Sequence, residues 1–190
     1  MRFTKADVLE AFQQQDISYR LAILSSHWLR GGAQYQPTAR DEANSLSMII
    51  SGKEIRFADV GKMLGEHSTM IQTTSIFVLN QLHTTVRAPF ELLRDYCEDY
   101  DGETQTELLV PRLQKASWFE FARLVRNAIS HNFHFEFVAS DRKKLPVTWN
   151  GITISGNLEG MPITYEIFAH RPGYELFLEM KAFADELPET

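Results

Sequence analysis

The stretch from Lys115 to Phe137, KASWFEFARLVRNAISHNFHFEF, constrains the fold of this chain more than any other. Ser117 and Glu120 stand at the spacing of a capping box, in which a hydroxyl and a carboxylate satisfy backbone N–H groups at a helix start. Apolar side chains then recur at helical spacing and predict a face packed against a core. This apolar face consists of Trp118, Phe121, Ala122, Val125, Ala128, Ile129 and Phe133. We therefore expect this helix to lie inside a helical bundle.

A second, polar face of the same predicted helix carries almost no acidic residues. Its members are Arg123, Arg126, Asn127, Ser130, His131 and His134. Surface helices usually mix charges of both signs, so this face indicates an anion site. Arg126 and Ser130, like Asn127 and His131, are four residues apart and are neighbours on a helix. Arginine offers phosphate oxygens a planar fork, and histidine carries protons near neutral pH. The face thus suits a phosphodiester.

Two other interpretations of these side chains stay open. In the plainer one, Arg126 is solvated and His131 caps a neighbouring element. In the other, His131, His134 and Glu136 hold a metal ion, because their side chains are common metal ligands. The chain contains neither H-E-x-x-H nor paired C-x-x-C, and Glu136 lies where the helix should end. We therefore expect no metal and no other cofactor.

Residues 126–131, Arg-Asn-Ala-Ile-Ser-His, resemble the R-x4-H signature of the HEPN superfamily, including the polar residue after the arginine. The resemblance covers roughly Glu42 to His134. It implies a small α-helical bundle and, in many members, a metal-independent endoribonuclease of toxin–antitoxin, abortive-infection or CRISPR-associated systems. It also implies that Arg126 and His131 are catalytic and that Asn127 orients them. Ser130, Arg123 and His134 are then candidate supporting or RNA-binding residues.

The resemblance implies further properties. Two chains would form a homodimer whose Arg126–His131 helices face each other, and an antitoxin protein is a candidate partner. Toxins paired with nucleotidyltransferase antitoxins often extend the motif to R-x4-H-x-Y, whose tyrosine is adenylylated. Phe133 stands at that position and has no hydroxyl, so we do not expect this form of control. The alternative function is a non-catalytic HEPN-like module that binds a nucleotide, RNA or a protein.

Charge and cysteine content narrow the class of protein further. The 190 residues carry a formal net charge of −6, which argues against general coating of nucleic acid. Residues 91–107 are acidic and residues 111–150 are richer in cations, so RNA would meet the second region. The single cysteine, Cys97, suits a reducing compartment. There is no long apolar run and no signal-peptide core. We therefore expect a cytoplasmic protein without membrane contact.

Start and stop signals along the chain predict a mainly α fold in one domain, 1–190. Thr4 and Asp7 have capping-box spacing, and Pro89 should kink or break the longest helix. N-terminal helices occupy 1–36, the HEPN-like helical core 37–137, and an extension 145–190. The expected helices are 5–15, 18–30, 37–50, 53–66 and 67–100, followed by an acidic loop at 98–107.

The hydrophobic pattern changes after the key helix. Val147 to Ile154 alternate with period two around Asn150-Gly151, the strongest short signal for a β-hairpin. Pro162 to Phe168 could add a third strand. Pro172 should open a terminal helix with apolar side chains inward. We therefore expect a small C-terminal β-hairpin and a terminal helix after the bundle.

Overall fold

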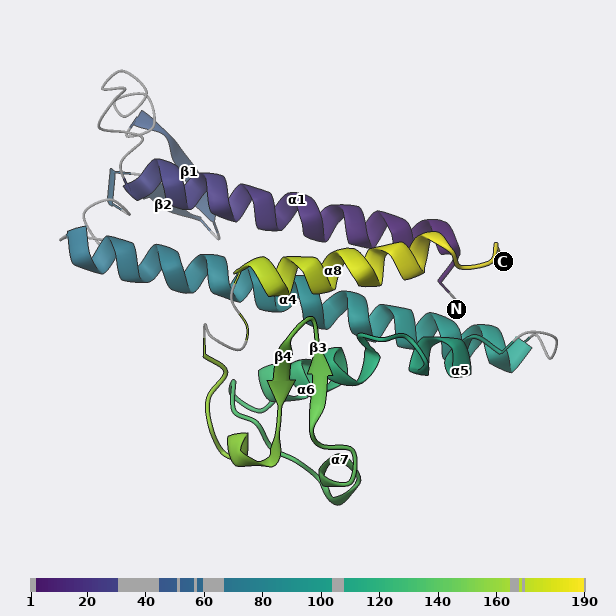
Figure 1. Cartoon of the computed structure of the whole chain (residues 1–190). Helices are drawn as coiled ribbons and strands as arrows, with labels where there is room; N and C mark the ends of the chain where they lie inside the picture. The colour runs from purple at the N-terminus through teal and green to yellow at the C-terminus, as the bar shows by residue number, and fades with distance from the viewer. Residues whose placement is uncertain are drawn as a thin grey trace. The chain divides into compact units, whose positions relative to one another are not determined.

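A computed structural model of the chain (Figure 1) describes residues 3–30, 45–50, 52–56, 58–59, 67–103, 108–164, 168 and 170–189. The fold is mainly α, as the sequence predicts. The elements are α1 (Lys5–Arg30), β1 (Ser47–Ile50), β2 (Lys53–Arg56), α4 (His67–Glu103), α5 (Leu109–Gln114), α6 (Phe119–Ser130), α7 (Ala139–Arg142), β3 (Val147–Trp149), β4 (Ile152–Ile154), a 3-10 turn η2 (Gly156–Leu158) and α8 (His170–Asp185). None of the described helices has an apolar stretch long enough to cross a membrane.

The chain divides into two compact units, and the candidate site belongs to the first. That unit contains residues 1–17 and 82–190, and the second contains residues 18–81. In the first unit, apolar side chains of α4, α6 and α8 form the core. Its fully buried members include Leu82, Val86, Leu93, Phe121, Val125, Leu176, Phe177 and Met180. The prediction of one domain over 1–190 stays a prediction.

Helix α1 is continuous, so the predicted break between residues 15 and 18 is wrong. Val8, Phe12, Tyr19 and Ala22 are all buried, and their spacing keeps one face inward across the predicted break. Neither Gly nor Pro interrupts this stretch. At the helix start, the Thr4 backbone N–H donates to the Asp7 carboxylate at 2.8 Å, and the Asp7 N–H donates to the Thr4 hydroxyl at 3.2 Å. The predicted capping box is confirmed.

Strands β1 and β2, residues 47–50 and 53–56, pair antiparallel where the sequence analysis expected the end of one helix and the start of another. Ser47 pairs with Arg56, and Ile50 pairs with Lys53. Gly52 has φ +75°, a backbone conformation that glycine adopts at little cost. The turn conformation and the adjacent Ile49 and Ile50 favour strands here. The remaining parts of those two predicted helices, 37–44 and most of 57–66, lie outside the described residues.

Helix α4 passes through Pro89 without ending, and it extends to Glu103 through most of the predicted acidic loop. Buried side chains on both sides of the proline, Val86, Phe90 and Leu93, hold the helix against the core, which compensates for the missing N–H. Near its end, the Asp101 carboxylate accepts the backbone N–H of Val110 at 2.9 Å and so caps α5. An acidic side chain here serves a helix start rather than a solvated loop.

The predicted C-terminal hairpin and terminal helix are confirmed. Strands β3 and β4 pair antiparallel, and Asn150 and Gly151 have φ of 47° and 78°, as a tight two-residue turn requires. The Trp149 ring packs on Phe121 of α6, with ring centroids 5.2 Å apart, so the hairpin covers α6. A third strand is not formed in the described part of 162–168, where one isolated bridge joins Pro162 to His134.

Candidate anion site on helix α6

The predicted apolar face is buried along α6, but its last member, Phe133, lies beyond the helix end. Phe121, Ala122 and Val125 are fully buried, whereas Phe133 is 39% exposed. The predicted capping box at Ser117 is wrong, because α6 begins at Phe119 with Trp118 as the N-cap residue and no side-chain cap. Backbone carbonyls of the preceding turn take over the free N–H groups: Phe119 donates to the Ala116 carbonyl at 3.0 Å.

Arg126 lies at the contact between α6 and α4. Its Nη2 is 2.6 Å from Oε1 of Glu91, and its Nε donates to the same oxygen at 2.9 Å. Its Nη1 donates to the side-chain oxygen of Asn127 at 3.0 Å. The polar face is therefore nearly acid-free along its own helix, but α4 supplies a carboxylate to it. Arg126 keeps 25% of its side chain exposed, so a ligand can still reach it.

The charge state of Glu91 is fixed by this contact. Burial opposes ionisation of the Glu91 carboxyl group, but hydrogen bonds and charges from Arg126 and then Arg87 outweigh it and hold its pKa below the usual value. Glu91 is thus ionised at neutral pH and neutralises much of the Arg126 charge. An incoming phosphate would compete with Glu91 for one guanidinium group.

His131 stands just beyond the last turn of α6, which ends at Ser130. Its backbone N–H still donates to the carbonyls of Asn127 at 3.0 Å and Ala128 at 3.1 Å. Its ring Nδ1 lies 3.2 Å from Oε2 of Glu136, with 52% of the histidine side chain and 62% of the glutamate side chain exposed. A carboxylate beside Nδ1 fixes the orientation of the imidazole ring. This leaves the opposite ring nitrogen, Nε2, for an external group.

Among the other predicted site residues, Ser130 and His134 bond to backbone carbonyls of residues 126 and 132, whereas Arg123 takes part in a separate contact. The Ser130 hydroxyl donates to the Arg126 carbonyl at 3.0 Å, and His134 Nδ1 is 2.8 Å from the Asn132 carbonyl. Arg123 points elsewhere: its Nε donates to Glu120 at 2.9 Å, and its Nη1 is 2.7 Å from Asp141. Within the described residues, no hydrogen bond or ion pair joins Arg126 to His131.

The backbone directly after His131 is strained. Asn132 and Phe133 have φ of 52° and 63°, the left-handed region that costs a bulky side chain roughly 1–2 kcal/mol. The Phe133 ring lies against the imidazole of His83 on α4, with centroids 4.7 Å apart. Strain of this kind often accompanies functional sites. Here it turns the chain sharply beside the candidate histidine.

His83 is a buried histidine to which the sequence analysis assigned no role. It is 5% exposed, and neither ring nitrogen has a hydrogen-bond partner within the described residues. Burial first, and then the charge of His170, lower the pKa of His83 to about 4. A second ring, that of Phe168, lies 6.0 Å away. His83 is therefore neutral at physiological pH.

Helix α4 provides residues that sequence reasoning did not assign to the site. His83, Arg87 and Glu91 follow one another at intervals of four residues and so share one face of α4. His83 meets the segment after His131, and Glu91 meets Arg126. The spacing of these three polar residues, one every four positions along α4, is the signal that could have located them. Their partners on α6 could be learned only from the tertiary structure.

The metal interpretation finds no support in the side-chain arrangement. Among the described residues, no three histidine, cysteine, aspartate or glutamate side chains are grouped to hold an ion. His131 and Glu136 are neighbours, but His134 bonds to a backbone carbonyl instead. Cys97 is fully buried, and burial, followed by the nearby Asp101 charge, raises its pKa to about 12. Its thiol is therefore unreactive.

Comparisons of the chain with protein-family models, with curated proteins and with solved structures find no significant match.

Proposed function

We propose that this protein is a metal-independent endoribonuclease of HEPN type, with Arg126 and His131 as its catalytic residues. The observation that supports this most is an exposed imidazole with a carboxylate at its Nδ1, five residues beyond an arginine held by Glu91. The R-x4-H resemblance assigns the same two residues. The same resemblance implies a role in toxin or anti-phage defence, and the single cysteine, Cys97, suits a cytoplasmic location.

The proposed reaction needs no group from outside the protein and the RNA. His131 accepts the proton of a ribose 2′-hydroxyl, whose oxygen attacks the adjacent phosphorus. The bond from phosphorus to the 5′-oxygen breaks, and that oxygen leaves with a proton. The products are a 2′,3′-cyclic phosphate and a 5′-hydroxyl. Arg126 stabilises the charge on the phosphorus centre, and a positioned general base contributes about 10²–10⁴-fold.

Among the described residues, His131 is the one exposed imidazole with a carboxylate partner, whereas the reaction needs both a base and an acid. We propose that a second copy supplies the acid, in a homodimer whose two Arg126–His131 segments face each other. Two-fold dimers are the commonest soluble oligomers. His134, three residues along, is the rival acid within one chain. An antitoxin that covers the same face is the corresponding protein partner.

The test is incubation of the purified protein with end-labelled total RNA in EDTA, followed by analysis of the product ends. We expect cleavage that leaves cyclic-phosphate and 5′-hydroxyl ends. His131→Ala should retain less than about a tenth of the activity, and Arg126→Ala should lose a similar or larger factor. Matched controls are His27→Ala and Arg171→Ala, which remove exposed side chains on α1 and α8. Activity of His131→Ala equal to that of His27→Ala would refute the proposal.

Glu91→Gln separates a catalytic from a structural Arg126. This variant removes the charge that Arg126 now neutralises but keeps the arginine. If Arg126 acts on phosphate, RNA should bind at least as tightly to Glu91→Gln as to the wild type. If Arg126 serves only to pair with Glu91, then Arg126→Ala and Glu91→Gln should both lower stability, and neither should change RNA binding.

A second candidate function is a non-catalytic module that binds RNA or a nucleotide. The engagement of Arg126 by Glu91 favours it, because the cation is already paired in the free protein. RNA binding by wild type and His131→Ala with equal affinity, without any cleavage by wild type, would select this candidate over the first.

A further inference from the structure

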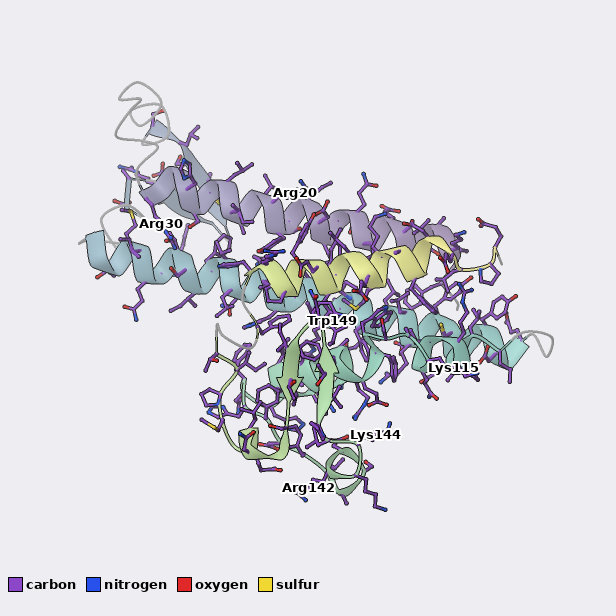
Figure 2. The ribbon with its side chains drawn as sticks, in the orientation of Figure 1. Arg20, Arg30, Lys115, Arg142, Lys144 and Trp149 are labelled. Atoms are coloured by element: carbon purple, nitrogen blue, oxygen red, sulfur yellow. The ribbon has the colours of Figure 1, made fainter. Side chains whose placement is uncertain are left out.

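A cleft lies on the first unit beside the N-terminal half of α6, away from His131. Its volume is about 340 Å³, within the range of small-ligand sites. Side chains from several elements line it: Arg94 of α4, Glu120 and Arg123 of α6, Asp141 of α7 and Lys144 just after α7. Figure 2 labels Lys144 in the α7 region, close to Arg142.

The charges in the cleft leave an excess of one cation. Arg94, Arg123 and Lys144 carry three positive charges, and Glu120 and Asp141 carry two negative ones. Arg123 is bound to both carboxylates, at 2.9 Å to Glu120 and 2.7 Å to Asp141, and Lys144 also pairs with Glu120.

The acidic partners of Arg94 lie on the surface. Asp95 and Glu98 are 49% and 58% exposed, and such exposed pairs are worth little. Arg94 can therefore turn to a ligand at small cost. Ser140 and Gln114 add neutral hydrogen-bonding groups to the lining.

A single excess positive charge matches a phosphodiester, which carries one negative charge. Arg123 and Arg126 are three residues apart on α6 and so are neighbours on its surface. An RNA strand whose scissile phosphate lies at Arg126 would therefore place a neighbouring phosphate at this cleft. We infer that the cleft between α4, α6 and α7 binds a phosphate of an RNA strand next to the one cleaved, and so positions the strand. This inference rests on the proposed function.

Lys144→Ala and Lys143→Ala form a matched pair for the test. Both lysines are exposed and adjacent in sequence, and only Lys144 lines the cleft. Each variant is made in a His131→Ala background, so that a labelled single-stranded RNA of about 12 nucleotides stays intact. We expect Lys144→Ala to raise the Kd roughly three- to fivefold and to lower the slope of log Kd against log salt by about 1. Lys143→Ala should change neither.

Glu120→Gln provides a test with the opposite sign. Removing this carboxylate raises the excess charge of the cleft from one to two, so RNA should bind more tightly. Glu10→Gln, which removes an exposed carboxylate on α1, should leave the Kd unchanged. Thermal melting of each variant checks folding independently of RNA.

The outcomes separate this inference from the proposed function. Equal effects of Lys144→Ala and Lys143→Ala, or weaker binding by Glu120→Gln, would overturn the phosphate subsite while leaving cleavage by Arg126 and His131 intact. A specific Lys144 effect in a protein that cleaves no RNA would support the subsite and reject the nuclease. If Lys144→Ala weakens the binding of AMP but leaves the Kd for RNA unchanged, the RNA subsite is overturned in favour of a mononucleotide site.

Discussion

Replacing His83 with a residue that cannot be protonated should make the free energy of unfolding depend less on pH. His83 is 5% exposed, and its two ring nitrogens lack partners among the described residues. Burial, together with the charge of His170, lowers its pKa from 6.5 to about 4. Between these two values the unfolded chain binds a proton at this position and the folded chain does not. The free energy of unfolding therefore rises with pH across this range and falls as pH drops from 6.5 toward 4.

The magnitude follows from the two pKa values. Between pH 7 and pH 5, His83 should cost the folded state about 2 kcal/mol, with a limit of about 3 kcal/mol once pH is below both values. His83→Phe keeps a flat ring against Phe133 and Phe168 and cannot be protonated. At pH 7 the variant also loses two unpartnered polar atoms, so its stability should equal or exceed that of the wild type.

The assay is urea unfolding at several pH values, followed by tryptophan fluorescence. Trp118 and Trp149 are each 4% exposed and belong to the same unit as His83, so they report on its unfolding. The difference in unfolding free energy between His83→Phe and wild type should grow by about 2 kcal/mol from pH 7 to pH 5. His27→Gln, at an exposed position, should show no such growth. A constant difference for His83→Phe would show that His83 is solvated or hydrogen-bonded in the folded protein.

Three other substitutions test a buried helix face, a buried ion pair and a helix cap in the first unit. Ala122→Asp places a carboxylate at a fully buried position of α6 and should unfold the first unit, as measured by circular dichroism; a folded variant would show that its faces are assigned wrongly. Arg123→Ala leaves Asp141, 2% exposed, without its cation and should lower the free energy of unfolding by about 3–5 kcal/mol. Adding Asp141→Asn to this variant should restore much of the lost stability. An unchanged free energy of unfolding in Arg123→Ala would contradict the pairing. Thr4→Ala removes the α1 cap and should cost about 1 kcal/mol in urea unfolding, whereas an unchanged midpoint would mean that the cap adds nothing.

The elements that the sequence alone determined are those whose signals are local. The Asn150-Gly151 turn requires left-handed backbone that these residues adopt at little cost, and φ values of 47° and 78° occur there. The spacing of Phe121, Ala122 and Val125 defines one face of a helix whatever lies opposite, and that face is buried. Fold class, hairpin and terminal helix could be predicted because each depends on neighbours within a few residues.

Tertiary structure decided everything that depends on which side chains meet across the core. The polar face of α6 reads as acid-free in sequence, but Glu91, 35 positions earlier on α4, pairs with Arg126. The predicted capping box at Ser117 is wrong because the Glu120 carboxylate pairs with Arg123 and Lys144 instead of accepting a backbone N–H. Helix α4 continues through Pro89 because packing on both sides outweighs the lost hydrogen bond. Contacts between residues far apart in sequence contribute stability that no local pattern encodes. The partner of a charged residue therefore cannot be predicted from its neighbours in sequence.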